Sequence, residues 1–458
     1  MMNKTVVIDI VGLSSAVIGD HTPFLKKWSA AHHIAPIAPM LPAVTTAVQS
    51  TYLTGAWPED HGIVGNGWYN RTTCEVKFWQ QSNRLVQAEK IWDKAKQLDP
   101  KFTCANMCWW YNMYSSVDFS LTPRPNYLSD GRKIPDCYTH PANLRDHLQK
   151  ELGAFPLFSY WGPGANIKSS QWIARASMIV EEQYHPTLTL IYLPHLDYCL
   201  QKFGKDISRI GAELEAIDQL VADLVHFYKN QYANILLLSE YGITDVNNPI
   251  HLNRLFREKG LLRVRTERGL ELLDAGASKA FAVADHQVAH IYVNDKSVLP
   301  QVRDLLEKTP GVELILDNER KKSHHLDHER AGDLVAIAGT QSWFTYYYWL
   351  DDQKAPDFAR LVAIHNKPGY DPVEMFMTSK LRAGYKLLRK KAGLRYLMDV
   401  IPLDARLVKG SHGRTGTLAT DHPVLISEKP FREASLQATD VHDVIWQQLT
   451  GNQAAAGA

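Results

Sequence analysis

The sequence predicts an α/β protein with one doubly wound, mostly parallel sheet, helices on both faces, and a smaller inserted α/β subdomain. Apolar runs of strand length recur along the 458 residues, each followed by a polar loop and a helix pattern. These runs are almost continuously apolar, as is typical of strands covered on both faces. Hydrophobic residues make up 45% of the chain, which is enough for a large core. We expect the core over 1–244 and 331–458, with the subdomain over 245–330.

The first elements are a strand over 5–11, a loop, and a short helix. Pro42 ends the approach to this helix, because proline restricts the residue before it. Thr45 or Thr46 can cap the helix, which we expect to run to about Leu53 and end at Gly55. A hydroxyl at a helix N-terminus faces free N–H groups, an arrangement suited to a phosphate.

The pattern continues along the rest of the chain. We expect helices over 85–97, 169–183 and 210–229, and a buried strand over 187–193. The stretch 102–113 predicts a strand that runs into an aromatic loop, and 234–244 a buried strand with its exit loop. The stretch 115–165 shows little periodicity and predicts a long insertion at the edge of the cleft. In the subdomain, 281–293 and 302–316 predict strand, helix, strand. The apolar stretch 333–339 then predicts a return to the main sheet, and 422–427 a final strand.

Charge and cysteine usage exclude several classes of protein. Lys and Arg total 50 and Asp and Glu total 49, which argues against a nucleic-acid-binding surface. The basic helical stretch 377–398 therefore predicts a solvated face near an anionic site. Five scattered cysteines argue against a disulfide framework or structural zinc. The N-terminal apolar run is too short for a membrane span and lacks a cleavage pattern, so we expect a cytoplasmic protein without a membrane partner.

Residues 41–69 carry the most specific motif. Its residues are Pro42, Thr45, Thr54, Gly55, Pro58, His61, Gly62, Ile63 and Asn66. This stretch resembles the nucleotide pyrophosphatase/phosphodiesterase family, the type I phosphodiesterases, of the alkaline phosphatase superfamily. The resemblance implies that Thr45 is the nucleophile and that Asn66 binds a phosphoryl oxygen. The alternative is that Thr45 is an ordinary N-cap.

Three later motifs follow the family's order. After the strand at 187–193, Tyr192 matches a position that stacks on a nucleobase, and Asp197 matches a metal ligand. Ser239, Glu240, Tyr241 and Gly242 stand where the family has Ser-Asp-His-Gly, so the resemblance implies that Glu240 binds metal. His412, in Gly-Ser-His-Gly, matches another metal ligand.

Four positions depart from the family's metal ligands: Val11, Gln201, Glu240 and Tyr241. Val11 replaces an Asp, and Asp9, two residues earlier on the same strand face, is the substitute we expect. Gln201 replaces a His and is a poor zinc ligand. Residues that could supply lost ligands are Asp20, His21, His195, His251, Asp285, His286 and His290, although a charged loop face explains the last four equally well.

The resemblance implies a metal-dependent hydrolase of phosphodiester or pyrophosphate bonds in small molecules, acting through a phosphothreonine intermediate. Asp9, Thr45 and Glu240 would hold one divalent ion, and Asp197 and His412 the other. Carboxylate and histidine ligands favour zinc, with manganese as an alternative.

The altered ligands leave other functions open. The chain could be a weakened or non-catalytic ligand-binding protein on the same fold, or a hydrolase of phosphonate or sulfate esters. Thr46 stands where many nucleotide-cleaving members carry an aromatic residue, which makes a nucleotide substrate less certain. The sequence predicts no particular oligomeric state.

Overall fold

The main sheet of the protein has eight strands. A computed structural model describes residues 2–129, 132–394, 396–431 and 434–451. The strand order is β2–β22–β11–β1–β10–β5–β6–β9. The strands β11, β1, β10, β5 and β6 are parallel, and antiparallel strands flank them at both edges. Their bounds are β1 Thr5–Ile10, β2 His33–Pro36, β5 Cys104–Met107, β6 Phe119–Pro123, β9 Cys137–His140, β10 Leu188–Leu193, β11 Asn234–Leu238 and β22 Val424–Ser427.

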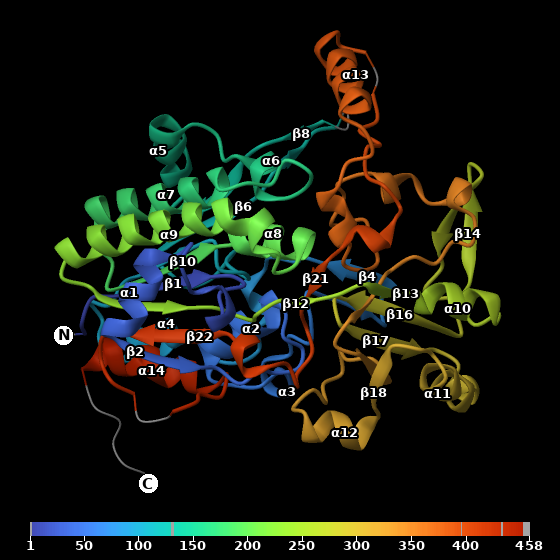
Figure 1. The fold of residues 1–458 in the computed structure, drawn as a ribbon, viewed down its shortest axis with the longest axis horizontal. Helices are drawn as coiled ribbons and strands as arrows, with labels where there is room; N and C mark the ends of the chain where they lie inside the picture. Colours follow the sequence, from blue (N-terminus) through green and yellow to red (C-terminus); the bar gives the residue numbers. More distant parts are fainter. Residues whose placement is uncertain (1, 130–131, 395, 432–433, 452–458) are drawn as a thin grey trace.

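Helices cover both faces of this sheet, which confirms the predicted fold class. One face lies under α7 (Lys168–Tyr184), α8 (His195–Phe203) and α9 (Ile207–Asn230), and the other under α2 (Thr45–Thr54) and α14 (Asp440–Thr450) (Figure 1). All six residues of β1 and of β10 are buried, because neither face of these central strands meets water. Further helices are α1 Pro23–Ala31, α3 Pro58–His61, α4 Ile91–Leu98, α5 Asn143–Leu152 and α6 Leu157–Tyr160.

Part of the stretch 115–165, which we expected to be a long insertion or lid edge over the cleft, belongs to the main sheet. Strands β6 and β9 from this stretch extend the main sheet, and a short hairpin of β7 (Asn126–Tyr127) and β8 (Lys133–Ile134) lies between them. The strands are short, and Pro123 ends β6, since proline has no N–H to continue the ladder. Short strands interrupted by proline give no clear alternation in the sequence.

A second, four-stranded antiparallel sheet has the order β16–β17–β19–β18 and its own hydrophobic core. Two expectations are corrected here. The stretch 281–293 is a hairpin rather than one strand, because the chain reverses at His286, whose φ is +60°. The strand at 333–339 pairs with β17 and β18 instead of joining the main sheet. The elements are β16 Ala280–Asp285, β17 Val288–Val293, β18 Val312–Leu316, β19 Leu334–Ala338, α10 Leu252–Glu258, α11 Leu299–Glu307 and α12 Asn318–Ser323.

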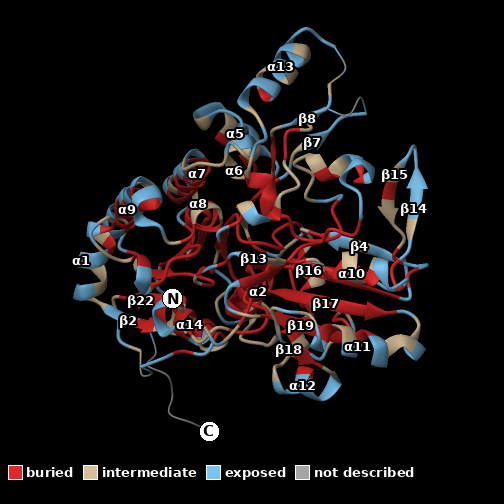
Figure 2. Ribbon diagram, turned by 45° about the vertical axis from the view of Figure 1, so that its right-hand side comes forward, coloured by how far each residue is buried: buried red, intermediate tan, exposed pale blue. Residues whose placement is uncertain are grey.

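Several two-stranded pairs lie outside the two sheets. They are β3 (Gly67–Asn70) with β4 (Glu75–Phe78), β12 (Thr244–Asp245) with β21 (Gly410–Ser411), β13 (Asn248–Ile250) with β20 (Ser342–Phe344), and β14 (Val264–Glu267) with β15 (Leu270–Leu273). Helix α13 (Lys380–Lys391) stands away from the body of the molecule in both ribbon views (Figures 1 and 2). In the described part of the chain, no helix combines the length and apolar character that crossing a bilayer requires.

Candidate active site

The residues selected from the sequence lie around the ends of three neighbouring parallel strands. Asp9 is near the end of β1, Asp197 lies in the first turn of α8 directly after β10, and Glu240 follows β11. These strands are adjacent in the order β11–β1–β10, so their carboxyl ends meet at one edge of the sheet. Thr45 begins α2, and His412 follows β21.

Thr45 does not cap its helix. The N-cap of α2 is Val44, without a side-chain capping bond, and Thr45 is the first helical residue, so the expected capping role is wrong. The Thr45 hydroxyl lies 3.1 Å from the Tyr241 hydroxyl and also within hydrogen-bonding reach of Glu240. Its side chain is buried, and its hydroxyl is directed at the site rather than used by its own backbone.

Asn66 lies at the N-terminus of α2. Its Oδ1 accepts a 3.1 Å hydrogen bond from the backbone N–H of Thr46, and its backbone N–H and Nδ2 donate to Asp285 at 2.8 and 3.1 Å. Burial raises the pKa of Asp285 to about 7, although both bonds from Asn66 oppose the shift. Asp285 therefore fixes the orientation of the Asn66 amide beside the helix start.

Asp9 and Glu240 form a buried carboxyl pair. The Gln49 side chain donates from Nε2 to both, at 3.3 Å to Asp9, and accepts a 2.6 Å bond from the Trp110 N–H. Desolvation raises the pKa of both carboxyls, and they hydrogen-bond to each other, so the pair retains a proton between them. We did not select Gln49 from the sequence, although its position one helical turn after Thr45 places both on one face of α2.

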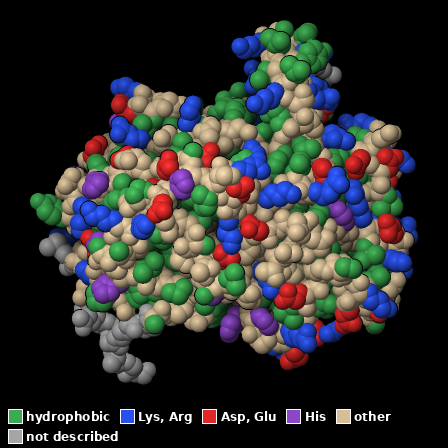
Figure 3. Space-filling model, in the orientation of Figure 1, with side chains coloured by type: hydrophobic (Ala, Val, Ile, Leu, Met, Phe, Trp, Pro, Cys, Tyr) green, Lys and Arg blue, Asp and Glu red, His purple; other side chains and the backbone are tan. Residues whose placement is uncertain are grey.

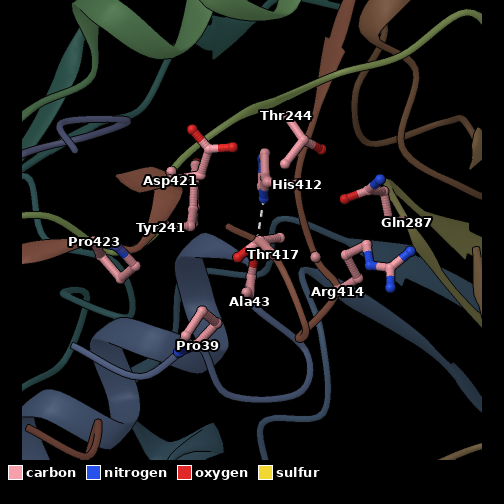
Figure 4. A pocket seen from close by; sticks show the side chains of 12 residues that line it. Pro39, Ala43, Tyr241, Thr244, Gln287, His412, Arg414, Thr417, Asp421 and Pro423 are labelled. Carbon is pink, nitrogen blue, oxygen red and sulfur yellow. Dashed lines mark hydrogen bonds between the residues drawn. The ribbon is translucent and has the colours of Figure 1, made fainter. Parts of the chain in front are cut away.

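Asp197 and His412 form the other half of the site. The Nδ1 of His412 donates to the Ala43 carbonyl at 2.7 Å, the dashed line in Figure 4. Its Nε2 has no hydrogen-bond partner and lies 3.8 Å from Oδ1 of Asp197, whose Oδ2 accepts a 2.7 Å bond from Gln201. Burial lowers the pKa of His412 to about 3 and raises that of Asp197 to about 7. The imidazole is therefore neutral, with a lone pair directed toward Asp197.

A column of stacked rings closes this half of the site. Tyr241 lies flat on His412, with ring centroids 3.5 Å apart and planes 7° apart, and its hydroxyl donates to Asp197 at 3.3 Å. The ring centroid of His286 lies 3.7 Å from that of His412 and 3.7 Å from that of Tyr370. The Tyr370 hydroxyl donates to Gln201 at 3.0 Å. Tyr370 was not selected from the sequence, where it is one of many tyrosines in an irregular segment.

Some of the other residues proposed from the sequence as metal ligands lie in the site, and others bond elsewhere. Asp285 and His286, at the β16–β17 turn, reach the site. His251 instead bonds Thr345 at 2.7 Å, and His290 bonds the Val64 carbonyl at 2.8 Å. Three more candidates form ion pairs that do not involve Asp197: His195 with Glu213, Asp20 with Lys26, and His21 with Glu215. Tyr192 is buried on β10, directly opposite Asp9 in the sheet register.

The donor set fits one divalent cation better than two. Among the described residues, no group of three or more His, Cys, Asp or Glu side chains is placed to hold a metal ion. His412 has the features of a metal ligand, because one ring nitrogen is held by a carbonyl and the other is buried without a partner. At Asp9 and Glu240 an amide N–H of Gln49 lies where positive charge is needed, and this suits a shared proton rather than a cation.

A small pocket lies behind the ring column. Its walls include Ala43, Tyr241, Gln287, His412, Arg414 and Asp421 (Figure 4). Arg414 is engaged with Glu313 at 2.8 and 2.9 Å, and Asp421 with Lys205 at 2.7 Å. The charged side chains of the pocket wall are thus already paired, whereas His412 Nε2, Gln287 Oε1 and Thr417 Oγ1 have no hydrogen-bond partner within the residues that the structure describes.

Structures of known proteins share this fold. The murine ectonucleotide pyrophosphatase/phosphodiesterase 5 superposes with a TM-score of 0.59 at 15% identity, covering 99% of this chain and 98% of that one. A phosphonoacetate hydrolase from Sinorhizobium meliloti superposes with a TM-score of 0.60 at 15% identity, covering 97% and 95%. At this identity the likeness concerns the fold alone.

Sequence comparison gives the family. A pyrophosphatase/phosphodiesterase of Schizosaccharomyces pombe is 24% identical over 236 residues, or 49% of this chain, and an ectonucleotide pyrophosphatase/phosphodiesterase of Caenorhabditis elegans is 21% identical over 311 residues, or 65%. The matched stretches span only 41% and 34% of those relatives' own lengths. The type I phosphodiesterase/nucleotide pyrophosphatase profile matches residues 5–371, most of the sequence. The chain therefore belongs to the type I phosphodiesterase/nucleotide pyrophosphatase family.

Proposed function

We propose that this protein hydrolyses phosphodiester or pyrophosphate bonds in small molecules, with Thr45 as the nucleophile. The observation that carries the proposal is the position of the Thr45 hydroxyl. It lies in the first turn of α2, between Tyr241 and Glu240 and beside the N–H groups of the helix start. In one structural relative, murine ectonucleotide pyrophosphatase/phosphodiesterase 5, a threonine-to-alanine variant is inactive and was solved with AMP bound.

The residues of the site suggest how the reaction proceeds. The Thr45 oxygen attacks phosphorus, a new O–P bond forms, and the bond to the leaving group breaks. The Asp9–Glu240 pair lies beside Thr45 and shares one proton, so its ionised carboxyl oxygen is positioned to take up the hydroxyl proton. Water then cleaves the phosphothreonine and regenerates the hydroxyl.

Asn66 and the start of α2 hold the transferred group. The Asn66 amide is fixed by Asp285 and by the Thr46 N–H, so its second Nδ2 hydrogen and the other N–H groups of the first turn remain for the phosphoryl oxygens. These groups stabilise the charge on the non-bridging oxygens as the transition state forms. Tyr241, bonded to both Thr45 and Asp197, holds the attacking oxygen in place.

Asp197 and His412 would hold a divalent cation, with zinc preferred and manganese as the alternative. Such an ion supplies Lewis-acid stabilisation of phosphoryl charge when bound. The cytoplasmic location predicted from the sequence remains part of the proposal, as does stacking of a substrate ring on Tyr192.

The test is hydrolysis of bis-p-nitrophenyl phosphate, with p-nitrophenyl phosphate as the monoester comparison, in protein loaded with zinc, loaded with manganese, or stripped by chelator. We expect diester turnover above monoester turnover, and phosphorylated Thr45 in peptide mass spectra after rapid acid quench. A protein inactive on both esters with either metal would favour the alternative of a weakened or non-catalytic binding protein. Turnover without any phosphothreonine would exclude the covalent mechanism.

A further inference from the structure

A projecting arm of the molecule, residues 377–398, has no role in the site. The described part of the arm contains α13, and its base is closed by Thr378, which donates from its backbone N–H and its hydroxyl to the Val400 carbonyl at 2.8 and 3.1 Å. Only Ala383 of this helix is buried. Figures 1 and 2 show the helix standing clear of both sheets in two orientations. Apart from Ala383, which belongs to the second hydrophobic core, and Met398, which packs against that core, the described residues of the arm lie outside both cores.

An apolar stripe runs along α13. Leu381, Tyr385 and Leu388 follow the spacing i, i+4, i+7, which puts them on one face of the helix. Their exposed fractions are 87%, 56% and 67%, and Leu394 and Leu397, beyond the helix, are 54% and 48% exposed. Isolated exposed leucines are common on protein surfaces, but a row of them on one face of a projecting helix indicates a surface that becomes covered.

The arm also concentrates positive charge. Residues 377–398 contain seven Lys or Arg and no Asp or Glu, whereas the whole chain has a formal net charge of only +1. At 100° per residue, Lys380 and Lys391 lie on one side of the apolar stripe and Arg389 on the other. Figure 3 shows blue Lys and Arg side chains among green hydrophobic ones on this projection.

Two of the basic residues have a structural role. Arg382 and Lys386 both pair with Asp399 at the base of the arm, the latter at 2.7 Å. They anchor the helix to the returning chain and leave the apolar stripe outward. The Lys390 ammonium lies 5.9 Å from the centre of the Phe158 ring of α6, which is also exposed. The basic and apolar surface thus continues from α13 onto α6.

We propose that the arm docks on an anionic lipid bilayer, with the stripe of Leu381, Tyr385 and Leu388 in the headgroup boundary and the flanking Lys and Arg residues on lipid phosphates. A helix with an apolar stripe between rows of basic residues has the pattern of interfacial membrane-binding helices. Nucleic acid would satisfy the charges but give the leucines no apolar environment. The sequence led us to expect no membrane partner, because the exposure of the stripe is visible only in the structure.

This docking does not depend on the hydrolytic activity. In this proposal the arm acts as a surface anchor.

The experiment is co-sedimentation of the full chain with vesicles of pure phosphatidylcholine and of phosphatidylcholine with about 30 mol% phosphatidylserine, whose headgroups make the vesicle surface negative. We expect binding to the anionic vesicles, weaker binding at high salt, and little binding to the neutral ones. Leu381→Ser/Leu388→Ser and, separately, Lys380→Glu/Lys391→Glu should each lower the partition coefficient roughly ten-fold or more.

Matched controls change the same residue types elsewhere. Leu98→Ser/Leu418→Ser removes two other exposed leucines, and Lys27→Glu/Lys101→Glu makes the same charge change away from the arm. Both should bind vesicles like the wild type, and all variants should keep the wild-type thermal midpoint. A protein that ignores anionic vesicles, or arm variants that bind like the controls, would overturn the proposal. Leucine-dependent self-association or RNA binding in place of vesicle binding would overturn it in favour of those partners.

Discussion

The Thr45 hydroxyl lies at the start of α2, 3.1 Å from the Tyr241 hydroxyl. It does not cap the helix, whose N-cap residue is Val44. We expect Thr45→Ala to lower diester turnover about 10³-fold or more, because no other hydroxyl occupies that point. The free energy of unfolding should change by only about 1 kcal/mol, the value of one hydrogen bond. The measurements are steady-state hydrolysis of bis-p-nitrophenyl phosphate and urea unfolding. Thr45→Ser is the control and should retain turnover, and a fully active alanine variant contradicts the assignment.

His412 carries the clearest metal-ligand geometry, with Nδ1 on the Ala43 carbonyl and a buried, unpartnered Nε2. We expect protein dialysed against zinc to retain one ion per chain, and His412→Asn to lose it. Elemental analysis by mass spectrometry measures this directly. His251→Asn is the matched control, since His251 bonds Thr345 outside the site and should leave zinc content unchanged. Equal zinc content in both variants would remove His412 from the ligand set.

At the scale of the element, α8 places residues 197 and 201 one turn apart on the same helix face. Gln201 already reaches Asp197 at 2.7 Å, so a histidine there presents a ring nitrogen beside Asp197 and His412. We expect Gln201→His to tighten zinc binding about ten-fold or more, because a third protein ligand completes the usual number for a catalytic zinc. Competition with a fluorescent chelator gives the affinity.

Gln201→Met is the control for this gain, because it keeps the length of the side chain and supplies no hard donor. It should bind zinc no better than the wild type. If the histidine and methionine variants have equal affinity, the cation does not bind at Asp197 and His412.

At the scale of the whole molecule, buried acids and buried histidines oppose each other in the pH dependence of stability. Burial raises the pKa of Asp285 from 3.8 to about 7, so the folded chain holds a proton that the unfolded chain releases above pH 4. The contribution of Asp285 to the free energy of unfolding therefore falls as pH rises from about 4 to about 7. Burial lowers the pKa of His61 and of His412 to about 3. Their contribution to the free energy of unfolding therefore falls as pH drops below 6.5.

Asp285→Asn separates the two effects, because asparagine does not titrate. We expect the variant to be less stable than the wild type at pH 5, where it loses one of the bonds from Asn66. At pH 8 the wild type must ionise the buried Asp285 carboxyl, which lowers its free energy of unfolding. The difference between wild type and variant should therefore be smaller than at pH 5, by about 3 kcal/mol at most. Urea unfolding at both pH values tests this, and a difference independent of pH would contradict the raised pKa.

Much of the framework could be predicted from the sequence. The apolar runs that became β1, β10 and β11 identified the sheet, and the ordered motifs identified the family. These features are local, because a strand buried on both faces must be apolar along its length and a motif is read within a few residues. Strands β6 and β9 were not predicted, because they are short and contain or adjoin proline, which leaves no clear alternation of apolar residues. Strand β19 was assigned to the wrong sheet, because the partner of a strand comes from a distant part of the chain.

The sequence by itself determined the parallel α/β core, the family and the positions of Thr45, Asp197 and His412. Only the tertiary structure decided which other polar residues join them. Asp285 and His286 enter the site while His251 and His290 bond elsewhere, and Gln49 bridges two carboxyls. It also decided that the leucines of α13 remain exposed. The reason is physical: the apolar pattern of a segment sets its own conformation, but the partner of a buried polar group comes from distant parts of the chain.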